Sequence, residues 1–284
     1  MESLFSLNPG PYQSIDAHAS TLLDFNEDLK EGVNVSISQP FVSKTTGFEL
    51  ELAPSPLYMR ASGIVRMSGG NLTVRVDNKE DVVAEFRNRL GRDLMATMVA
   101  SAKLQSLKTP DITGNLLYKG NTFVSEMRAS NKSEGLVGVS HLHAINKSFA
   151  VGFDTFFKPT SNLTGGSAAL RYQGTFGRAP FQTKLSVDHQ QMISLSGFTA
   201  LNNASFAARV CLDTQKQEHC AVFGSSLWFS LKVGGHIVPI TITGRTSTTL
   251  EHAVLVHIPT PQVAILINTS IKQNKPTFGL SLVL

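Results

Sequence analysis

The chain of 284 residues contains little charge, and this limits the classes of protein to which it can belong. Asp, Glu, Lys and Arg make up 16% of the residues, against about 25% in soluble domains. The mean hydropathy is nevertheless only +0.02, so the chain lacks the apolar bulk of a helical membrane protein. Low charge with balanced hydropathy is typical of a membrane β-barrel, because each strand presents one face to lipid and the other to water.

The sequence also lacks a long apolar segment with helical periodicity. The longest candidate, residues 252–271, carries Pro259 and Pro261 near its centre, and proline breaks a helix interior. Apolar residues recur at every second position on both sides of these prolines, which predicts two strands and a turn. The N-terminus shows neither a basic and then apolar stretch nor an arginine-rich leader. We therefore expect neither a secretory signal nor a mitochondrial presequence.

Signatures of catalysis and of nucleic-acid binding are absent as well. No nucleophile elbow, zinc-protease motif, phosphate-binding loop or dinucleotide fingerprint occurs. The net charge of +4 comes from Lys and Arg scattered along the chain, whereas nucleic-acid binders gather them on one face. We expect a protein that is not an enzyme, that needs no metal or cofactor, and that binds no nucleic acid.

Two pairs of side chains are the remaining candidates for chemistry. His141 and His143 would share one strand face and could bind a metal, but no third ligand lies near them in the sequence. A polar pair in a barrel lumen is the favoured reading. Cys211 and Cys220 flank a polar loop symmetrically and could face each other across a hairpin. We expect reduced thiols there, with a disulfide as the alternative.

The last eight residues are the most informative segment of the chain. Apolar residues alternate there with small or polar ones, as in a strand with one apolar face. The pattern also resembles the C-terminal sorting signal of mitochondrial outer-membrane β-barrels, with its positions filled by Thr277, Gly279, Leu282 and Leu284. An ordinary edge strand of a soluble β protein is the alternative.

Residues 1–31 differ from everything that follows. Pro11 suits a first helical position, and Ile15, Ala19 and Leu22 recur at helical spacing. We predict one amphipathic helix from about Pro11 to Leu23, whose apolar stripe needs a wall to cover it and so lies in a barrel lumen. An acidic linker follows, with Asp24, Glu27, Asp28 and Glu31.

From residue 32 onward the apolar residues follow a period of two. Short turns marked by Gly, Asn or Pro separate the segments. We expect a strand even at residues 79–92, where a helical turn would also fit. The remaining length holds on the order of 18–20 membrane strands. The chain thus divides into an N-terminal segment with a lumen helix, residues 1–31, and a transmembrane β-barrel, residues 32–284.

The N-terminal motif adds a family resemblance. Residues 7–12, Leu-Asn-Pro-Gly-Pro-Tyr, followed by a short helix, resemble the Asn-Pro-Gly segment of the mitochondrial porin family. More narrowly, they are similar to the channel-forming subunits of the translocase of the outer mitochondrial membrane. Residues 32–38, 111–123 and 139–145 resemble strands of that family. The resemblance implies an all-β fold, a transmembrane antiparallel β-barrel of about 19 strands with the N-terminal helix inside the lumen.

The same resemblance implies a function and partners. The protein would be a multi-pass channel in the outer membrane of a mitochondrion or a related organelle, and it would import unfolded precursor proteins. Its partners would be precursors with basic presequences, the receptor and small subunits of the translocase, membrane lipid and other copies of the pore. A metabolite channel of the voltage-dependent anion type is the first alternative, and a soluble β protein that binds a ligand is the second.

Acidic side chains in the lumen would attract basic presequences through electrostatics. The alternation predicts that one set of acids points inward: Glu49, Glu51, Asp77, Glu126, Asp154, Asp188 and Asp213. Of these, Asp77 and Asp213 could instead belong to turns. The first six, together with the acidic linker, are the candidate presequence-binding residues.

Overall fold

A computed structural model describes residues 8–24, 32–40, 46–54, 57–77, 81–103, 110–132, 135–233, 236–260, 263–272 and 275–283. These residues form a 3₁₀-helix, one short α-helix and a sheet of 19 strands. The helices are η1 (Tyr12–Ser14) and α1 (Ala17–Leu23). The strands are β1 (Gly32–Pro40), β2 (Thr46–Pro54), β3 (Leu57–Met67), β4 (Gly70–Asp77), β5 (Asp81–Arg89), β6 (Leu94–Lys103), β7 (Asp111–Lys119), β8 (Phe123–Ser130), β9 (Leu136–Ala144), β10 (Phe149–Lys158), β11 (Leu163–Phe176), β12 (Ala179–Asp188), β13 (Met192–Leu201), β14 (Ala204–Asp213), β15 (Glu218–Val233), β16 (His236–Ser247), β17 (Glu251–Pro259), β18 (Ala264–Lys272) and β19 (Lys275–Val283).

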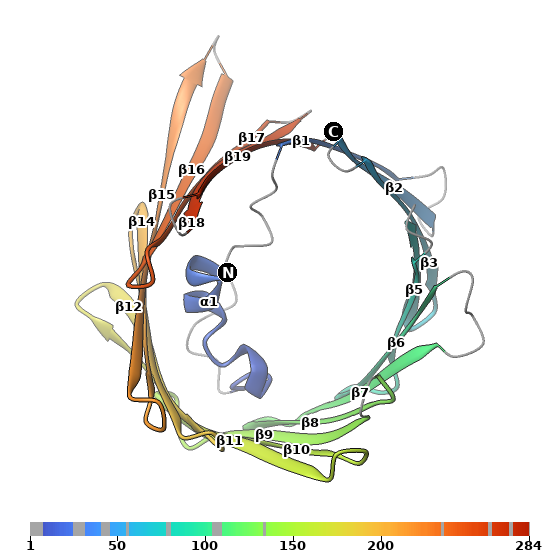
Figure 1. The fold of residues 1–284 in the computed structure, drawn as a ribbon, viewed down its shortest axis with the longest axis vertical. Coiled ribbons are helices and arrows are strands. Elements are labelled where there is room, and N and C mark those ends of the chain that lie inside the picture. Colours follow the sequence, from blue (N-terminus) through green and yellow to red (C-terminus); the bar gives the residue numbers. More distant parts are fainter. Residues whose placement is uncertain are drawn as a thin grey trace.

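The sheet closes into a ring with the N-terminal helix inside it (Figure 1). Each strand pairs with its neighbours in chain order, and β1 pairs with both β2 and β19. The predicted all-β antiparallel fold with one short N-terminal helix is confirmed. The seam between β1 and β19 is the exception, because that pair is parallel. A meander with an odd number of strands brings its first and last strands together in the same direction.

Side chains along each strand alternate between the two faces of the wall. In β10, Ala150 is 1% exposed and Val151 is 44% exposed, and the same alternation continues to Phe153. The period of two in the sequence reflects this geometry. The strand predicted within residues 79–92 is confirmed as β5. Of residues 252–271, residues 252–259 lie in β17 and residues 264–271 lie in β18, while Pro261 and Gln262 lie outside the described residues.

The N-terminal segment differs in detail from its prediction. The continuous helix expected over residues 11–23 is broken into η1 and α1 at Ile15 and Asp16. Asp16 has a non-helical φ of −122°, and the carbonyl of Ile15 accepts a hydrogen bond from Gln182 Nε2 on β12. The wall thus competes for backbone groups that a continuous helix would use itself. Neither helix in the described ranges is long and apolar enough to cross a bilayer.

Candidate functional site

The two faces of the barrel wall differ in polarity. Large apolar side chains are exposed on the outer face, among them Val151, Leu185, Leu195, Val210 and Phe229. The inner face buries many polar side chains: Ser140, Arg171, Gln173, Gln182, Ser196, Ser205, Ser226, Thr243, Asn268 and Ser281. An apolar exterior around a polar interior suits a barrel surrounded by lipid. The inner face, with the segment it encloses, is therefore the candidate site.

The N-terminal segment packs its apolar side chains against one part of the inner wall. Tyr12 and Ile15 form a cluster with small and apolar residues of β9, β10 and β11, namely Leu142, Ala150 and Ala169. Ala19, Leu22 and Leu23 form a second cluster around Ala207 of β14. Ile15, Ala19 and Leu22 are all buried, so the prediction that this stripe is covered by a wall is confirmed.

The absence of a side chain at Gly224 lets α1 come close to β15. A Cβ atom built there would lie 2.7 Å from the carbonyl oxygen of Leu22 and 3.1 Å from Leu23 Cδ2. Contacts under about 3 Å to a backbone atom force a displacement. The close approach of the helix to this wall therefore requires glycine or a shift of α1.

Two arginines of the wall bind backbone carbonyls of the N-terminal segment. Arg171 of β11 donates from Nη1 to the carbonyl of Pro9 at 2.8 Å. Arg245 of β16 donates from Nη1 to the carbonyl of Leu23 at 3.0 Å. Leu23 is the last residue of α1, where carbonyls lack helical partners and the helix dipole is negative. A cation at that position donates a hydrogen bond to an unpartnered carbonyl and also offsets the negative end of the helix dipole.

Asp16 and Asp24 connect the two ends of α1 to cations of the wall. Asp16 Oδ2 lies 3.5 Å from Lys184 Nζ and 3.7 Å from Arg209 Nη2. Arg209 Nη2 also lies 2.9 Å from Asp24 Oδ2 and donates to Ser20 Oγ at 2.9 Å. Arg209 is only 21% exposed in its side chain, so these charges interact in a partly desolvated setting where screening is weak. The helix is held along its length by ion pairs.

Tyr12 adds a neutral hydrogen bond near the start of the segment. Its hydroxyl lies 2.9 Å from Ser167 Oγ on β11. Burial raises the pKa of the Tyr12 phenol above its ordinary value, because removal from water disfavours the charged form. Tyr12 therefore stays protonated through the physiological range and keeps this hydrogen bond.

Two of the predicted lumen acids lie in the middle of the wall with partners of their own. Glu126 of β8 is 4% exposed and accepts a hydrogen bond from Asn115 Nδ2 at 2.7 Å. Asp154 of β10 forms an ion pair with Arg128 of β8. The structure brings these four side chains together on β7, β8 and β10. Part of the negative charge expected in the lumen is therefore balanced locally.

Two further predicted acids lie at strand ends and organise turns. Asp77, the last residue of β4, accepts a hydrogen bond from the backbone N–H of Asp81 at 2.9 Å. Asp188, the last residue of β12, accepts backbone N–H groups of Gln190 and Met192, both at 2.9 Å. These contacts are typical of carboxylates that cap turns. Both acids lie at the same end of the barrel, away from Glu126.

The other candidates are only partly described. Glu49 and Glu51 lie in β2, where the register pairs them with Ser62 and Arg60 of β3, while their own side chains lie outside the description. Of the acidic linker only Asp24 is described, and Glu27, Asp28 and Glu31 lie outside the described residues. Of the C-terminal motif, Thr277, Gly279 and Leu282 lie in β19, and Leu284 lies outside the described residues.

A family model for eukaryotic porins matches residues 8–232. The chain belongs to the eukaryotic porin family. The matched range begins at the Asn-Pro-Gly turn and ends in β15, so it includes both the lumen segment and most of its wall. Members of this family are channels rather than enzymes. No curated protein matches the sequence.

Sequence reasoning missed some of the residues that hold the lumen segment of this porin. Lys184, Arg245 and Gln182 contact the segment directly, yet none was predicted as a site residue. For Lys184 and Arg245 the available signal was a cation at an inward strand position, as for Arg171 and Arg209, whereas nothing in the sequence marked Gln182. Because the partner atoms are mostly backbone carbonyls or acids in residues 9–24, the pairing could not be read from the strands alone.

The prediction for His141 and His143 is wrong. Ser140 and Leu142, their neighbours in β9, are buried on the inner face, so the two imidazoles lie on the outer face of this porin. Their rings stack at 6.3 Å, and His141 Nδ1 lies 2.8 Å from Ser125 Oγ. They belong to an aromatic row on the outside, with Phe123 and Phe153. No cluster of three potential metal ligands occurs among the described residues.

Cys211 and Cys220 occupy opposite positions in the β14–β15 hairpin, as the sequence suggested. Both are free thiols in the structure. A cystine bridge is therefore not needed to define this hairpin, whose register is set by continuous backbone pairing from Ala204 to Asp213.

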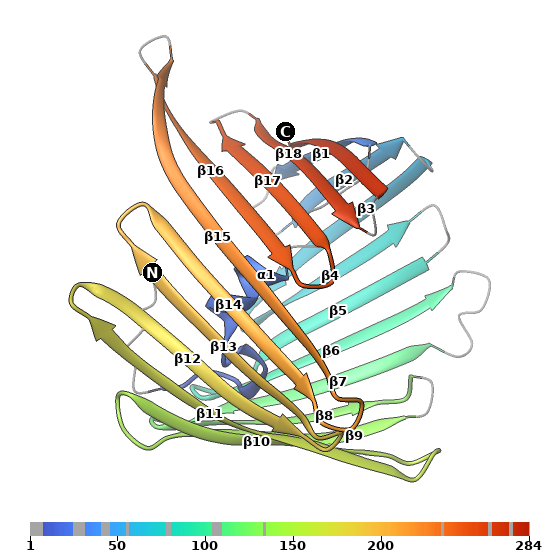
Figure 2. The same cartoon turned by 60° about the vertical axis from the view of Figure 1, so that its left-hand side comes forward.

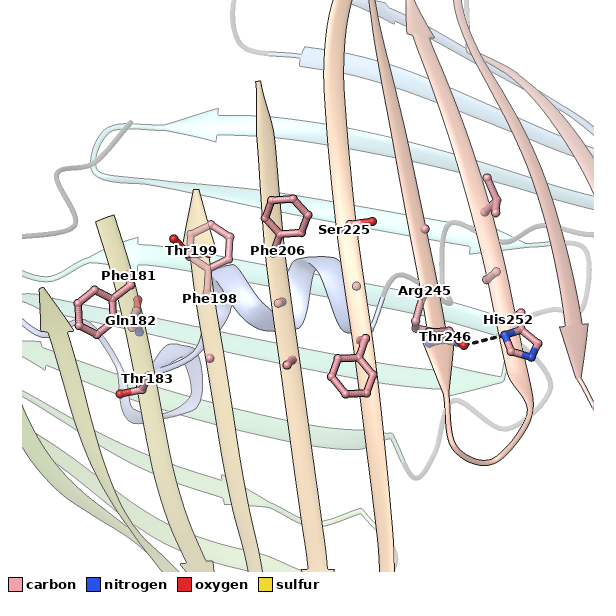
Figure 3. A pocket seen from close by; sticks show the side chains of 18 residues that line it. Phe181, Gln182, Thr183, Phe198, Thr199, Phe206, Ser225, Arg245, Thr246 and His252 are labelled. Carbon is pink, nitrogen blue, oxygen red and sulfur yellow. Dashed lines mark hydrogen bonds between the residues drawn. The ribbon is translucent and has the colours of Figure 1, made fainter. Parts of the chain in front are cut away.

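A hollow of about 740 Å³ extends across β12–β17. Its outward-facing lining includes the rings of Phe206 and Phe223 and three small residues, Gly197, Ala208 and Gly244. Figure 3 shows these strands with the lumen helix behind them. The hollow is apolar and results from outward glycine and alanine, so it belongs to the exterior of the porin.

Proposed function

We propose that this porin is a protein-conducting channel of the outer mitochondrial membrane, which imports unfolded precursor proteins. The apolar outer face and the polar inner face support insertion of the 19-stranded sheet as a transmembrane barrel. The closed pairing leaves no sheet edge among the described strands, which removes the cost of unpaired backbone groups in lipid.

The Asn8-Pro9-Gly10 turn is the observation that carries the choice of cargo. This motif resembles that of protein-conducting members, and its residues form hydrogen bonds within the turn and to the barrel wall. Gly10 has a φ of +74°, and its N–H donates to Asn8 Oδ1 at 3.0 Å. Asn8 Nδ2 donates to the carbonyl of Gly120 at 2.7 Å. The turn therefore attaches the start of the lumen segment to the β7–β8 end of the barrel.

The attachment keeps the segment against one side of the barrel. The main contacts of η1 and α1 are with β9, β10 and β13 to β16, and Figure 1 shows the helix on that side of the ring. An extended chain could pass along the opposite wall. A translocation pore does no bond chemistry and needs only a wet path that binds its cargo weakly.

Electrostatics would supply that weak binding. Basic presequences would first meet the acids of the mouth that holds Asp77 and Asp188, then those of the lumen. The further partners would be receptor and small subunits of a translocase, membrane lipid and a second copy of the pore. In this proposal the last strand also carries the sorting signal, because it supplies the strand that seals the barrel.

A metabolite channel is the second candidate, and the family match favours it at least as well. Both candidates predict a pore, and they differ in what interacts with it. A presequence peptide should occlude a protein-conducting channel at concentrations where a scrambled, non-amphipathic peptide of equal charge does not.

The decisive measurement is single-channel recording of the purified protein in planar bilayers. We expect frequent, voltage-dependent blockades by the presequence peptide and few by the scrambled control. Equal effects of both peptides, together with selective flux of small organic anions, would favour the metabolite channel instead. An absence of any conductance would contradict both candidates.

Membrane targeting has its own test at the last strand. Leu282 pairs with Val35 of β1 and with Ile265 of β18. Leu282→Asp places a charge on the outward face of the seam, where contact with lipid disfavours a charged side chain. We expect this variant to remain outside the carbonate-resistant membrane fraction, whereas Leu282→Ile integrates. Normal integration of the aspartate variant would argue against the sorting role.

A further inference from the structure

The charged residues at the two ends of the barrel are distributed unequally. We call the end at which the odd-numbered strands finish the odd rim, and the end at which the even-numbered strands finish the even rim. Figure 2 shows that the connecting turns gather at these two ends. Each rim consists of the described turn residues together with the two strand residues on either side of each turn.

Cations dominate the odd rim. Its described residues include seven cations, namely Arg66, Arg89, Arg92, Lys119, Lys147, Arg178 and Lys232. Asp93 is the single carboxylate among the described residues of this rim. All eight side chains are exposed. The odd rim thus carries a large excess of fixed positive charge at the surface.

The even rim is nearly balanced. Its described acids are Asp77, Asp81, Asp111, Asp188, Asp213, Glu218 and Glu251, and its described cations are Lys103, Lys132, Lys158, Lys216, Lys272 and Lys275. Several of these charges pair locally, with Lys216 Nζ 3.5 Å from Asp213 Oδ2 and Lys272 Nζ 3.0 Å from Glu251 Oε1. The positive charge of the odd rim therefore has no counterpart here.

The strand register directs two of the odd-rim cations toward the pore. Lys119 is two residues beyond Leu117, which is buried on the inner face of β7. Arg66 lies at the same strand parity as Ser62, which is buried on the inner face of β3. Because side chains two apart share a face, these cations line the mouth of the lumen.

We propose that the odd rim is an anion-collecting mouth that makes the pore an ionic rectifier. This inference rests on the proposed channel function, and it holds for either cargo. Fixed cations at one mouth concentrate anions and repel cations there, within about one Debye length, which is about 10 Å at 0.1 M salt. The nearly balanced even mouth admits both signs.

The direction of rectification follows from which ions can leave the lumen. When the bath at the even rim is positive, anions move inward through the odd mouth and cations move inward through the even mouth. The odd mouth hinders the exit of those cations, so both ions accumulate and the conductance rises. At the opposite polarity the lumen is depleted of ions, and the conductance falls. Fields of fixed charge act on ion access in this way whenever they are not screened.

Single-channel current–voltage curves of the full chain in bilayers of neutral lipid test the proposal. We expect currents at opposite voltages of equal size to differ by at least about 1.5-fold at 0.1 M KCl, and the curve to become symmetric near 1 M, where the Debye length is about 3 Å. Orientation can be read from Asn202→Cys, at the exposed β13–β14 turn of the odd rim, in a Cys211→Ser/Cys220→Ser background. Biotin at that cysteine and streptavidin in one bath identify the odd side.

Matched variants separate this charge effect from the shape of the pore. Arg92→Gln/Lys147→Gln/Arg178→Gln removes three cations from turns of the odd rim and should bring the current ratio toward unity. Lys132→Gln/Lys216→Gln/Lys272→Gln removes three exposed cations from the even rim and should increase the ratio. An unchanged ratio in both variants, or a symmetric curve of the parent at low salt, overturns the proposal while leaving the channel function intact. Failure to form any channel overturns both.

Discussion

The part of the barrel wall that contacts the N-terminal segment and the part opposite it differ in how their inward side chains are packed. The helix-bearing wall has small inward residues, such as Ala150, Ala207 and Gly224, and charged side chains that are largely covered. On the opposite wall, Arg75 and Arg87 reach Glu85, and their side chains are 48% and 60% exposed. Close approach of a helix requires small residues and fixed partners, whereas an open wall can leave its charges in water.

The largest expected effect comes from closing the space beneath α1. Gly224→Val places methyl groups where a Cβ alone lies 2.7 Å from the Leu22 carbonyl, so α1 must shift. Overpacking of this kind costs about 1–3 kcal/mol, and we expect the upper part of that range. Proteolysis within residues 9–24 should accelerate sharply. Gly63→Val on β3 is the control, because a Cβ there meets nothing within 4 Å; similar acceleration in both variants would contradict the comparison.

A smaller loss of docking free energy is expected when one arginine of the helix-bearing wall is replaced by glutamine, and a still smaller one when an arginine of the opposite wall is replaced. Arg209→Gln removes contacts to Asp16, Asp24 and Ser20. We expect a loss of docking free energy of about 1–2 kcal/mol, seen as a roughly 5- to 30-fold faster cleavage of the N-terminal segment. Arg87→Gln on the opposite wall should change the cleavage rate by less than about 3-fold, because exposed pairs contribute little. Equal increases in the cleavage rate for Arg209→Gln and Arg87→Gln would show that charged side chains of the two walls contribute equally to docking of the N-terminal segment.

The smallest effect concerns Tyr12. Tyr12→Phe removes the hydrogen bond to Ser167 and should weaken docking by about 1 kcal/mol. Since the pKa of Tyr12 is raised in the folded protein, its contribution is complete below the ordinary tyrosine pKa of about 10 and is lost as the pH rises through the folded value. The parent should therefore release the segment in strong alkali more readily than Tyr12→Phe does. Identical alkaline profiles would mean that another group controls the release.

Most of the fold could be predicted from the sequence, because strand alternation is a local property. The period of two identified the strands, including β5, and prolines at residues 259 and 261 ruled out a spanning helix. The faces of β9 could not be predicted in the same way. Leu142 turns inward because it packs against Tyr12 and Ile15, and this contact across the lumen carries both histidines to the outside.

The candidate site was predicted less well than the fold, for the same physical reason. The buried stripe of Ile15, Ala19 and Leu22 followed from helical spacing, yet the helix breaks at Asp16 because wall residues bind its neighbours. The acids Glu126 and Asp154 were identified as inward residues, but their partners Asn115 and Arg128 lie on other strands. Interactions between segments distant in sequence leave no periodic signal.

The parallel seam sets the order in which the molecule can be completed. Eighteen pairs of strands that are consecutive in the chain can form one hairpin at a time, but Gly32 gains its second partner, Gly279, only when the first and last strands meet. Closing the described sheet therefore needs the one strand pairing whose two partners lie at opposite ends of the chain.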